Sequence, residues 1–376
     1  MDFSINEDQH MLQDSVAKFI DNDYDFDTRM AAADSELGYS QERWQTFAEL
    51  GLTAVPFAEE DGGLDGGAIE LMLLMEQFGR GLVVEPYLPS IVLAGGVLKA
   101  LATTEQKAAW LEPLISGEKT AALAWIEPQS RYNLADVAVT ATASGDGYTL
   151  SGHKTVVLNG GNADTLVVSA RTAGERTDAA GISLFVIDAN AAGITRTSYK
   201  TVDARQAGEV RFDNVSVSAE QLLGTAGEGF ATLQHVVAEG IIAVGAEAVG
   251  IMDTLNRKTL EYTKQRVQFG QPIAAFQALQ HRMVDMLTVA EETRSLLLHA
   301  VMRAGEGDAA ATEQALRALK IQIGTDGRKL GEEAVQLHGG MGVTWELDVA
   351  HYFKRLTMID TLFGNASHHI ERYSLA

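Results

Sequence analysis

The hydrophobic pattern changes its period twice along the 376 residues, and this ordering restricts the possible folds more than any other feature of the chain. Residues 1–120 repeat with helical spacing, residues 121–225 switch to short strand-like runs, and residues 226–376 return to helical spacing. The last zone opens with a long and nearly unbroken helical pattern from Phe230 to Arg266. The sequence therefore predicts an α+β protein with an N-terminal helical domain (1–120), a middle β domain (121–225) and a C-terminal helical domain (226–376).

The middle zone favours an antiparallel barrel or sandwich. Apolar and small polar residues alternate from Val137 to Ala143, and the Gly145-Asp146-Gly147 run that follows is typical of a hairpin. Further strand-like runs begin at Thr165, Ile182 and Glu209. No helical segment separates these runs, as helices would in a parallel sheet.

The final zone predicts a bundle of long helices. After Phe230–Arg266, two further helices are expected over Ala278–Ala304 and Ala309–Leu337. The first helix is expected to stop at Gly270 and Pro272, because a glycine followed by a proline is a common helix exit.

Composition excludes several classes of protein. A formal net charge of −22 argues against nucleic acid or an anionic membrane surface as the main partner, because both require an excess of Lys and Arg. The chain has no cysteine, which removes disulfides, thiolate nucleophiles and iron–sulfur clusters. The longest run without a charged residue, Val267–His281, contains four Gln and a Pro, so no membrane span is predicted. The acidic N-terminus lacks the features of a signal peptide, and we expect a cytoplasmic protein.

Common catalytic motifs are missing from the sequence. His368 and His369 are the only adjacent histidines, and neighbours on a helix point about 100° apart, which makes them a poor metal-binding pair. We therefore predict no metal site. The nucleophile elbow Gly-x-Ser-x-Gly, the dinucleotide fingerprint Gly-x-Gly-x-x-Gly and the Walker motif do not occur either.

Two motifs remain as candidate binding sites. One is Arg266-Val-Gln-Phe-Gly-Gln-Pro with the nearby Gln277, and the other is Gln336-Leu-His-Gly-Gly-Met-Gly. The first motif is interpreted either as a helix end aided by the helix dipole or as a cation offered to a ligand. The second is either a tight turn between helices or a turn whose glycines let a ligand approach. The residues alone leave both pairs of interpretations open.

With these motifs in place, the whole chain resembles the acyl-CoA dehydrogenases. Matching stretches include Met1-Asp-Phe-Ser-Ile-Asn-Glu-Asp-Gln, Glu49-Leu-Gly-Leu-Thr-Ala-Val-Pro, Phe212-Asp-Asn-Val-Ser-Val and the two motifs above. The resemblance implies an N-terminal helical domain, a middle antiparallel β-barrel or sandwich, and a C-terminal four-helix bundle. It implies FAD as the cofactor, with these contacts to its pyrophosphate and adenosine half: Arg266, Gln268, Phe269, Gln277, Gln336, Gly339 and Gly340.

The resemblance also implies a reaction. A carboxylate removes the α-proton of an acyl-CoA thioester, and the β-hydrogen leaves as hydride to the flavin. An electron-transfer flavoprotein is then the implied electron acceptor. Hydrogen-bond donors to the thioester oxygen and a base whose pKa is raised by burial would favour this chemistry. Fatty acid or steroid degradation is the implied setting, and dicarboxylyl, ring-bearing and steroid-derived acyl groups all fit, because chain selection depends on cavity shape.

The usual catalytic base of the family has no counterpart here. The family's Tyr-Glu-Gly-Thr motif matches the segment from Leu362 to Asn365, where Phe363 stands in place of the glutamate. Some relatives hold the base on the long helix, at the position of Gly240 in this chain. The neighbouring Glu239 is a candidate base if the helix is bulged or tilted, and a partly buried, paired acid otherwise.

Contacts to the flavin ring also differ. The family's Thr-Glu-Pro-Gly-Ala-Gly-Ser-Asp corresponds to a segment that begins with Ile126 and lacks the first hydroxyl. Where the family has a Trp over the ring and a Thr that reaches flavin N5, this chain has Val156 and Leu158, which neither stack as Trp does nor donate a hydrogen bond.

These departures predict a divided cofactor site. In the family, the Arg266 and Gln336 motifs reach the FAD of a neighbouring subunit, so an intact pair beside a degraded ring pocket indicates a chain that completes a partner's site. The chain resembles small (β) subunits of heteromeric enzymes such as pimeloyl-CoA dehydrogenase, and we expect an α2β2 tetramer with a large acyl-CoA dehydrogenase subunit, in which this chain alone is inactive. Two alternatives remain: a self-sufficient homotetramer that uses Glu239, and a flavin-free scaffold of the same fold.

Overall fold

The structure is a computed structural model that describes residues 5–375, and its contacts divide the chain into two compact units. Unit 1 contains the residues up to Ala31, together with Ala68–Val83 and Ile241–Ala376. Unit 2 contains Ala32–Gly67 and Val84–Gly240. The first four residues of the family-like opening lie outside the described residues. The division into three domains at about residues 120 and 225 stays a prediction.

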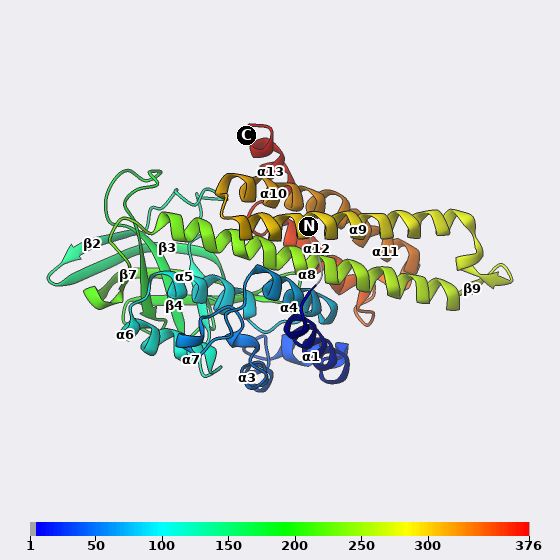
Figure 1. The fold of residues 1–376 in the computed structure, drawn as a ribbon, viewed down its shortest axis with the longest axis horizontal. Helices are drawn as coiled ribbons and strands as arrows, with labels where there is room; N and C mark the ends of the chain where they lie inside the picture. The colour runs from blue at the N-terminus through cyan, green and yellow to red at the C-terminus, as the bar shows by residue number, and fades with distance from the viewer. Residues whose placement is uncertain (1–4, 376) are drawn as a thin grey trace. The chain divides into compact units, whose positions relative to one another are not determined.

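An eight-stranded sheet forms the centre of unit 2 (Figure 1). Its hydrogen-bonded order is β6-β7-β3-β2-β4-β5-β8, with β1 paired to β4. The strands are β1 (Ala121–Ala124), β2 (Thr140–Ser144), β3 (Gly147–Leu158), β4 (Thr165–Arg171), β5 (Ile182–Asp188), β6 (Ile194–Lys200), β7 (Gln206–Ser218) and β8 (Leu222–Leu223). The apolar side chains of alternate positions, among them Leu150, Val168 and Phe185, meet in one buried core.

The sheet departs from the predicted antiparallel arrangement at two places. Strand β1 runs parallel to β4, and β2 forms one parallel pair with β4 between Thr140 and Arg171. Strand β2 also begins at Thr140, three residues after the alternating pattern that predicted it. The parallel pairing depends on residues far apart in sequence, which a local periodicity does not report.

Short helices complete unit 2: α3 (Gln41–Glu49), η1 (Leu52–Ala54), η2 (Glu59–Asp61), η3 (Leu88–Gly95), α5 (Gly96–Leu101), α6 (Thr104–Gln106), η4 (Lys107–Leu111), α7 (Glu112–Ile115) and η5 (Ala219–Gln221). Helix α2 (Phe26–Asp34) spans the boundary between the units. The buried Ser90 hydroxyl joins η3 to β1, because it donates to the Ala121 carbonyl at 2.9 Å and accepts from the Ala121 N–H at 3.0 Å.

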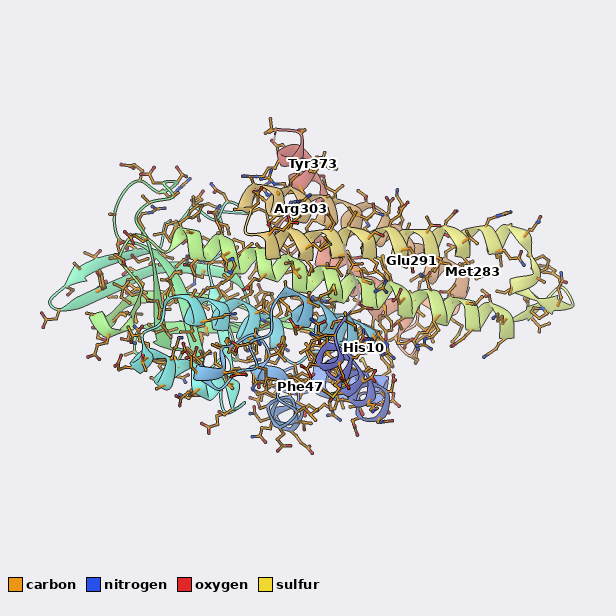
Figure 2. All side chains as sticks on the ribbon, viewed as in Figure 1. His10, Phe47, Met283, Glu291, Arg303 and Tyr373 are labelled. Atoms are coloured by element: carbon orange, nitrogen blue, oxygen red, sulfur yellow. The ribbon has the colours of Figure 1, made fainter. Side chains whose placement is uncertain are left out.

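Unit 1 consists of helices from both ends of the chain. They are α1 (Glu7–Asp23), α4 (Ala68–Gly81), the larger part of α8 (Phe230–Gln265), α9 (Gln277–Glu306), α10 (Ala309–Gln322), η7 (Ile323–Gly327), α11 (Arg328–His338), η8 (Gly339–Val343), α12 (Val349–Thr361) and α13 (Ala366–Tyr373). Met283, Glu291 and Arg303 mark successive stretches of α9 in Figure 2. Helix α1 begins with a capping box in which Asn6 and Gln9 satisfy each other's backbone N–H groups.

Two glycines bring α4 and α8 into direct backbone contact. A Cβ atom on Gly79 would lie 2.1 Å from the carbonyl oxygen of Glu247, and one on Gly250 would lie 2.0 Å from that of Glu76. Beside this contact, Arg355 of α12 donates two hydrogen bonds to the buried Glu247 carboxylate, at 2.8 and 2.6 Å. The bidentate geometry compensates both charges inside the helical core.

The helix expected over Ala309–Leu337 is interrupted. It consists of α10, a π-helical turn at Ile323–Gly327, and α11. A Cβ on Gly324 would lie 2.0 Å from the Asp360 carboxylate, so the glycine permits the close approach of α12. Periodicity alone does not reveal one inserted residue in a continuous helical pattern.

Helix α8 is the one helix, within residues 5–375, that is long and apolar enough to cross a bilayer by length and composition. Within its most apolar window, 83% of the residues are buried inside the structure. Such burial is what the core helix of a folded protein shows.

Candidate functional site

The first candidate motif forms an exposed hairpin at the end of α8. Strands β9 (Val267–Gln268) and β10 (Gln271–Pro272) pair antiparallel around Phe269 and Gly270, and Figure 1 shows this hairpin where α8 ends and α9 begins. Both central residues have positive φ, +54° and +81°, as in the type I′ turns of two-residue hairpins.

Phe269 is unusual at this place for two reasons. Its left-handed backbone is unfavourable for a bulky side chain, and 91% of its surface is exposed. Its ring has an edge-to-face contact with Phe276, at 6.0 Å between centroids. A strained and exposed aromatic residue is typical of a binding surface, because a merely structural turn would favour Asn or Gly here.

The second motif lies at the end of α11. Gln336 and the two following glycines of the motif, Gly339 and Gly340, are exposed, and no atom lies within 4 Å of a Cβ placed on either glycine. Gly339 has a φ of +60°. The backbone is therefore open for close approach by a ligand, which is the property that the glycines suggested.

The structure brings the two motifs together through residues that the sequence analysis did not single out. Tyr262, one helical turn before Arg266, stacks on His338 at 4.4 Å between ring centroids. The His338 ring is buried, and its Nδ1 lies 2.8 Å from the Ala334 carbonyl. The sequence did offer two signals of this contact. Tyr262 is an aromatic residue four positions before the first motif, and His338 is a histidine inside the second.

Arg266 is the cation of this surface. It is exposed and makes no ion pair with any of the described residues. Gln268 and Gln277 are exposed beside it, and the Gln268 amide donates only to the carbonyl of its neighbour Val267, at 2.9 Å. A guanidinium and two amides can bind the oxygens of a phosphate or pyrophosphate.

Glu239 lies on α8 within unit 2, and its carboxylate faces α5. A Cβ on Gly96 would lie 3.3 Å from Glu239 Oε2, and His235 lies 3.6 Å from Oε1. Burial raises the pKa of Glu239, and the nearby His235 and Lys99 charges oppose that rise. Glu239 thus combines a raised pKa, as a catalytic base would have, with a nearby histidine, as a paired structural acid would have.

Phe363 stands in the turn between α12 and α13, in unit 1. It is buried and has a φ of +58°, and the following Gly364 has a φ of +109°. His369 Nε2 lies 3.2 Å from the Phe363 carbonyl, and Asn365 caps α13 through the N–H of His368. These hydrogen bonds fix the turn. The side chain of Phe363, however, is a hydrocarbon that cannot accept a proton.

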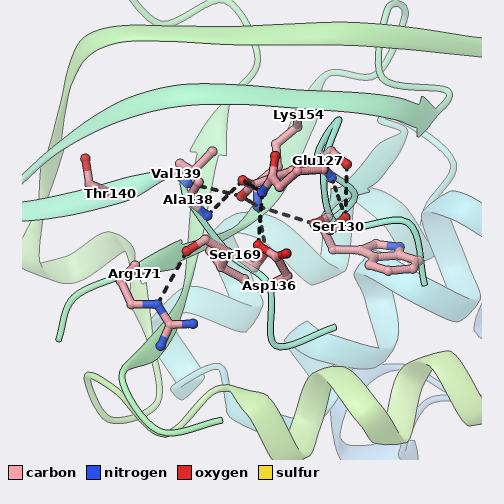
Figure 3. A network of polar contacts seen from close by, with 12 residues as sticks. Glu127, Ser130, Asp136, Ala138, Val139, Thr140, Lys154, Ser169 and Arg171 are labelled. Carbon is pink, nitrogen blue, oxygen red and sulfur yellow. Dashed lines mark hydrogen bonds and ion pairs between the residues drawn. The ribbon is translucent and has the colours of Figure 1, made fainter. Parts of the chain in front are cut away.

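In unit 2, the segments with Ile126, Val156 and Leu158 lie around a buried ion pair. Lys154 Nζ contacts Glu127 Oε1 at 2.7 Å and the Ser169 hydroxyl at 2.9 Å (Figure 3). Burial lowers the pKa of Lys154 to about 8, against the opposing effect of Glu127. Burial alone would raise the pKa of Glu127, but Lys154 and further donors hold it below its ordinary value.

Within residues 5–375, no group of three or more His, Asp or Glu side chains is arranged to hold a metal ion. His368 and His369 have ring centroids 5.2 Å apart at an angle of 84°.

Family models match almost the whole chain. They are the acyl-CoA dehydrogenase N-terminal domain over residues 6–118, the middle domain over 122–215 and the C-terminal domain over 227–373. A short-chain-specific acyl-CoA dehydrogenase from Megasphaera elsdenii is 31% identical and is aligned over 84% of each chain. The chain belongs to the acyl-CoA dehydrogenase family. Members of this family are FAD-dependent oxidoreductases.

Three other acyl-CoA dehydrogenase relatives are informative. A caffeyl-CoA reductase-Etf complex subunit from Acetobacterium woodii is 29% identical, with 84% of each chain covered. The structure of butyryl-CoA dehydrogenase from Megasphaera elsdenii is 27% identical, with a TM-score of 0.91 over 100% of this chain and 99% of that one. A structure of a Tcur3481-Tcur3483 steroid ACAD variant is 28% identical, with a TM-score of 0.87 over 98% and 97%.

The residues present fit only part of an FAD molecule. The exposed Arg266 and the open backbone at Gly339 and Gly340 suit the pyrophosphate and adenosine half. At the ring half, Val156 and Leu158 offer aliphatic surface without a hydrogen-bond donor.

Proposed function

We propose that this chain is the β subunit of an α2β2 acyl-CoA dehydrogenase and completes the FAD site of a large partner subunit. The proposed cofactor contacts are Arg266, Gln268, Phe269, Gln277, Gln336, Gly339 and Gly340. The observation that carries the proposal is a contrast between two residues. Arg266, at the start of an exposed hairpin, pairs with no charged side chain among residues 5–375, whereas Phe363 is buried at the position of the base.

The intact half of the site supports a role toward another chain. The hairpin residue Phe269 is 91% exposed and strained, and Val267 beside it is 54% exposed. Apolar surface of this kind is stabilised when a partner covers it. The Tyr262–His338 stack holds both motifs on one surface, so a single partner could meet the two together.

The missing base and flavin-ring contacts support the proposal that a partner subunit supplies them. FAD, when bound, supplies the acceptor for the hydride that leaves the acyl-CoA thioester. Phe363 cannot take the α-proton, and Val156 and Leu158 cannot bond to the ring, so the partner is proposed to supply the base and the ring contacts. The 28% identical Tcur3481-Tcur3483 steroid ACAD is a relative whose name joins two proteins, in line with a heteromeric assembly.

The remaining parts of the proposal follow the same resemblance. An electron-transfer flavoprotein is the proposed electron acceptor, supported by the name of the Etf complex subunit from Acetobacterium woodii. We propose a cytoplasmic enzyme, without a membrane span, whose three domains are residues 1–120, 121–225 and 226–376.

Co-expression tests the assembly directly. The chain purified alone is expected to be colourless and inactive, and a co-expressed large subunit should give a yellow, active tetramer. A yellow and active protein from this chain alone would instead support the homotetramer. A protein that stays colourless with every large subunit would support the flavin-free scaffold.

Arg266→Ala tests the cofactor contact. Loss of a charge-assisted contact to phosphate should weaken FAD retention by roughly tenfold or more, measured by flavin absorbance after dialysis of the assembled complex. Arg257→Ala is the matched control, because Arg257 is an exposed arginine of α8, nine residues before Arg266, and pairs with Glu261 at 3.4 Å. Equal FAD content in both variants would reject Arg266 as a phosphate ligand.

The homotetramer alternative is favoured by the half-buried place of Glu239, whose carboxylate faces α5 at Gly96 and whose pKa is raised by burial. If the chain alone is active, Glu239→Gln should abolish turnover while FAD stays bound. Retained turnover in that variant would reject Glu239 as the base.

A further inference from the structure

The flavin-side segment of β3 contains a β-bulge that redirects one side chain. Lys154 pairs with Val210 of β7 and Val157 pairs with Gly208, so Thr155 and Val156 both stand opposite Glu209. In a regular strand Val156 would follow Lys154 with a two-residue period into the core. The extra residue moves Val157 into that buried place and leaves Val156 39% exposed.

Val156 has a strained backbone as a result. Its φ is +49°, in the left-handed region, where a β-branched residue is a true outlier. Such strain persists only where the surroundings fix it. The structure shows what fixes it on both faces of the sheet.

On the outer face, Glu209 binds the bulge and its neighbours. Its carboxylate accepts the Thr155 hydroxyl at 2.6 Å and contacts His153 Nε2 at 2.5 Å. The Tyr199 hydroxyl also donates to Glu209 Oε1, at 3.5 Å. One carboxylate therefore contacts Thr155, the first residue of the bulge, and His153, two residues before it.

On the inner face, Glu127 binds the same stretch through Lys154. Glu127 also accepts the N–H groups of Ala138 and Val139, at 2.8 and 3.1 Å, so it ties β3 to the segment that leads into β2 (Figure 3). The N–H of Thr155 donates to the carbonyl of Ile126, next to Glu127 in the chain, at 2.9 Å. Lys154 is fully buried, so its place in the strand is fixed by this pair.

We propose that Glu209 and Glu127 are positioning residues that act from opposite faces of the sheet to force the β3 bulge. With residues 153–155 held on both sides, the extra residue is driven into the left-handed conformation at Val156. The result is that the aliphatic side chain of Val156 is held outside the core, 39% exposed, before any cofactor binds. The proposal concerns the cofactor-free chain and stands whether or not the proposed heteromer is found.

The strain gives a direct readout. Val156→Gly should raise the urea midpoint of the chain, because glycine adopts a positive φ without strain. Val202→Gly is the matched control: Val202 is an exposed valine of the same unit without a positive φ, and its replacement should lower the midpoint. A fall in the midpoint for both variants would overturn the claim of stored strain.

The role of Glu209 is tested by hydrogen exchange of the cofactor-free chain. In Glu209→Gln the amides of residues 155–158 should exchange about tenfold faster than in the wild type, since a charge-assisted contact is lost. The stabilisation by Val156→Gly should also shrink in that background, because an unclamped bulge can relax. Unchanged exchange together with an undiminished Val156→Gly effect would overturn the role of Glu209.

The inner clamp is tested by removing both of its charges together, as Glu127→Gln with Lys154→Met, so that no unpaired charge is left buried. The exchange of residues 155–158 should rise as it does in Glu209→Gln. Should the double variant fail to fold, Ser169→Ala removes one partner of Lys154 and should raise the same exchange by a smaller factor. Exchange at the wild-type rate in the folded variant would remove Glu127 from the proposal.

Discussion

The imidazole of His338 stacks on the ring of Tyr262, with the two ring planes 29° apart. This contact joins the end of α8 to the end of α11: Tyr262 lies one helical turn before the first candidate motif, and His338 is part of the second. The geometry of the binding surface therefore depends on a pair of side chains that need not touch any ligand.

His338→Ala should loosen this surface. Loss of the stack removes about 1 kcal/mol of aromatic contact energy, and the loss of ring burial adds to it. We expect weaker FAD retention in the assembled complex, together with a lower urea midpoint. His299→Ala, at an exposed position on α9, serves as the control. Unchanged FAD retention in His338→Ala would show that the motifs keep their positions without the stack.

Phe269→Asn distinguishes the role of Phe269 in the hairpin from its proposed role in binding a partner subunit. Asparagine suits the left-handed position of a type I′ turn, so the isolated chain should be as stable as the wild type or slightly more stable. The interface with the partner, however, loses the exposed aromatic ring of Phe269. We expect at least tenfold weaker assembly, since a buried aromatic anchor often contributes about 2 kcal/mol or more to an interface. Analytical ultracentrifugation of the mixed subunits would measure this. Wild-type assembly would place the partner surface elsewhere.

Arg355→Ala should destabilise the helical core strongly. It leaves the Glu247 carboxylate buried without its bidentate partner, a change that typically costs about 3–5 kcal/mol. The double replacement Arg355→Met with Glu247→Met should recover most of that loss, because neither charge then remains. Urea unfolding of the two variants is the measurement. A double variant no more stable than Arg355→Ala would show that packing rather than the unpaired charge dominates.

Lys320 predicts a specific pH dependence of stability. Its Nζ donates to the carbonyls of Ile359 and Asp360 at the end of α12, and burial lowers its pKa from 10.5 to about 7, with Asp360 opposing. Below pH 7 the folded and unfolded chains both hold the proton. Between pH 7 and 10.5 the unfolded chain holds more, so stability should rise with pH, by at most about 1.4 kcal/mol per unit.

Lys320→Met should therefore flatten this rise, because the titrating group is gone. Urea midpoints at pH 7, 8 and 9 would compare the variant with the wild type. The exposed Lys329→Met is the control, since Lys329 pairs with Asp326 at the surface and should leave the profile intact. An identical slope in Lys320→Met and the wild type would show that Lys320 keeps its proton throughout.

The sequence predicted the long C-terminal helices and the strands β2, β3, β4, β5 and β7, because each has a strong local pattern. The breaks in those elements were not predictable in the same way. The π-turn at Ile323–Gly327 inserts one residue without a change in hydrophobicity, and its Gly324 closely approaches Asp360, a residue distant in sequence. The parallel pairing of β1 depends on β4, which is distant in the chain.

The candidate site was predictable where single residues carry distinctive chemistry. Arg266 and the glycines of the second motif stand out in the sequence, and the structure finds them exposed and open. The Tyr262–His338 stack and the Glu127–Lys154 pair join residues far apart in sequence, so no local pattern reports them. A lysine at an inward position of an alternating strand was the one local sign of the buried pair.

The backbone contact at Gly79 and Gly250 has a consequence for biosynthesis. The partner surface of α4 belongs to α8, which leaves the ribosome only after the entire sheet has been synthesised. Until then the side of α4 that faces α8 has no partner to cover it, a condition that favours chaperone binding or aggregation of the nascent chain. Truncated products that end before α8 should share that fate, whatever the quality of their β strands.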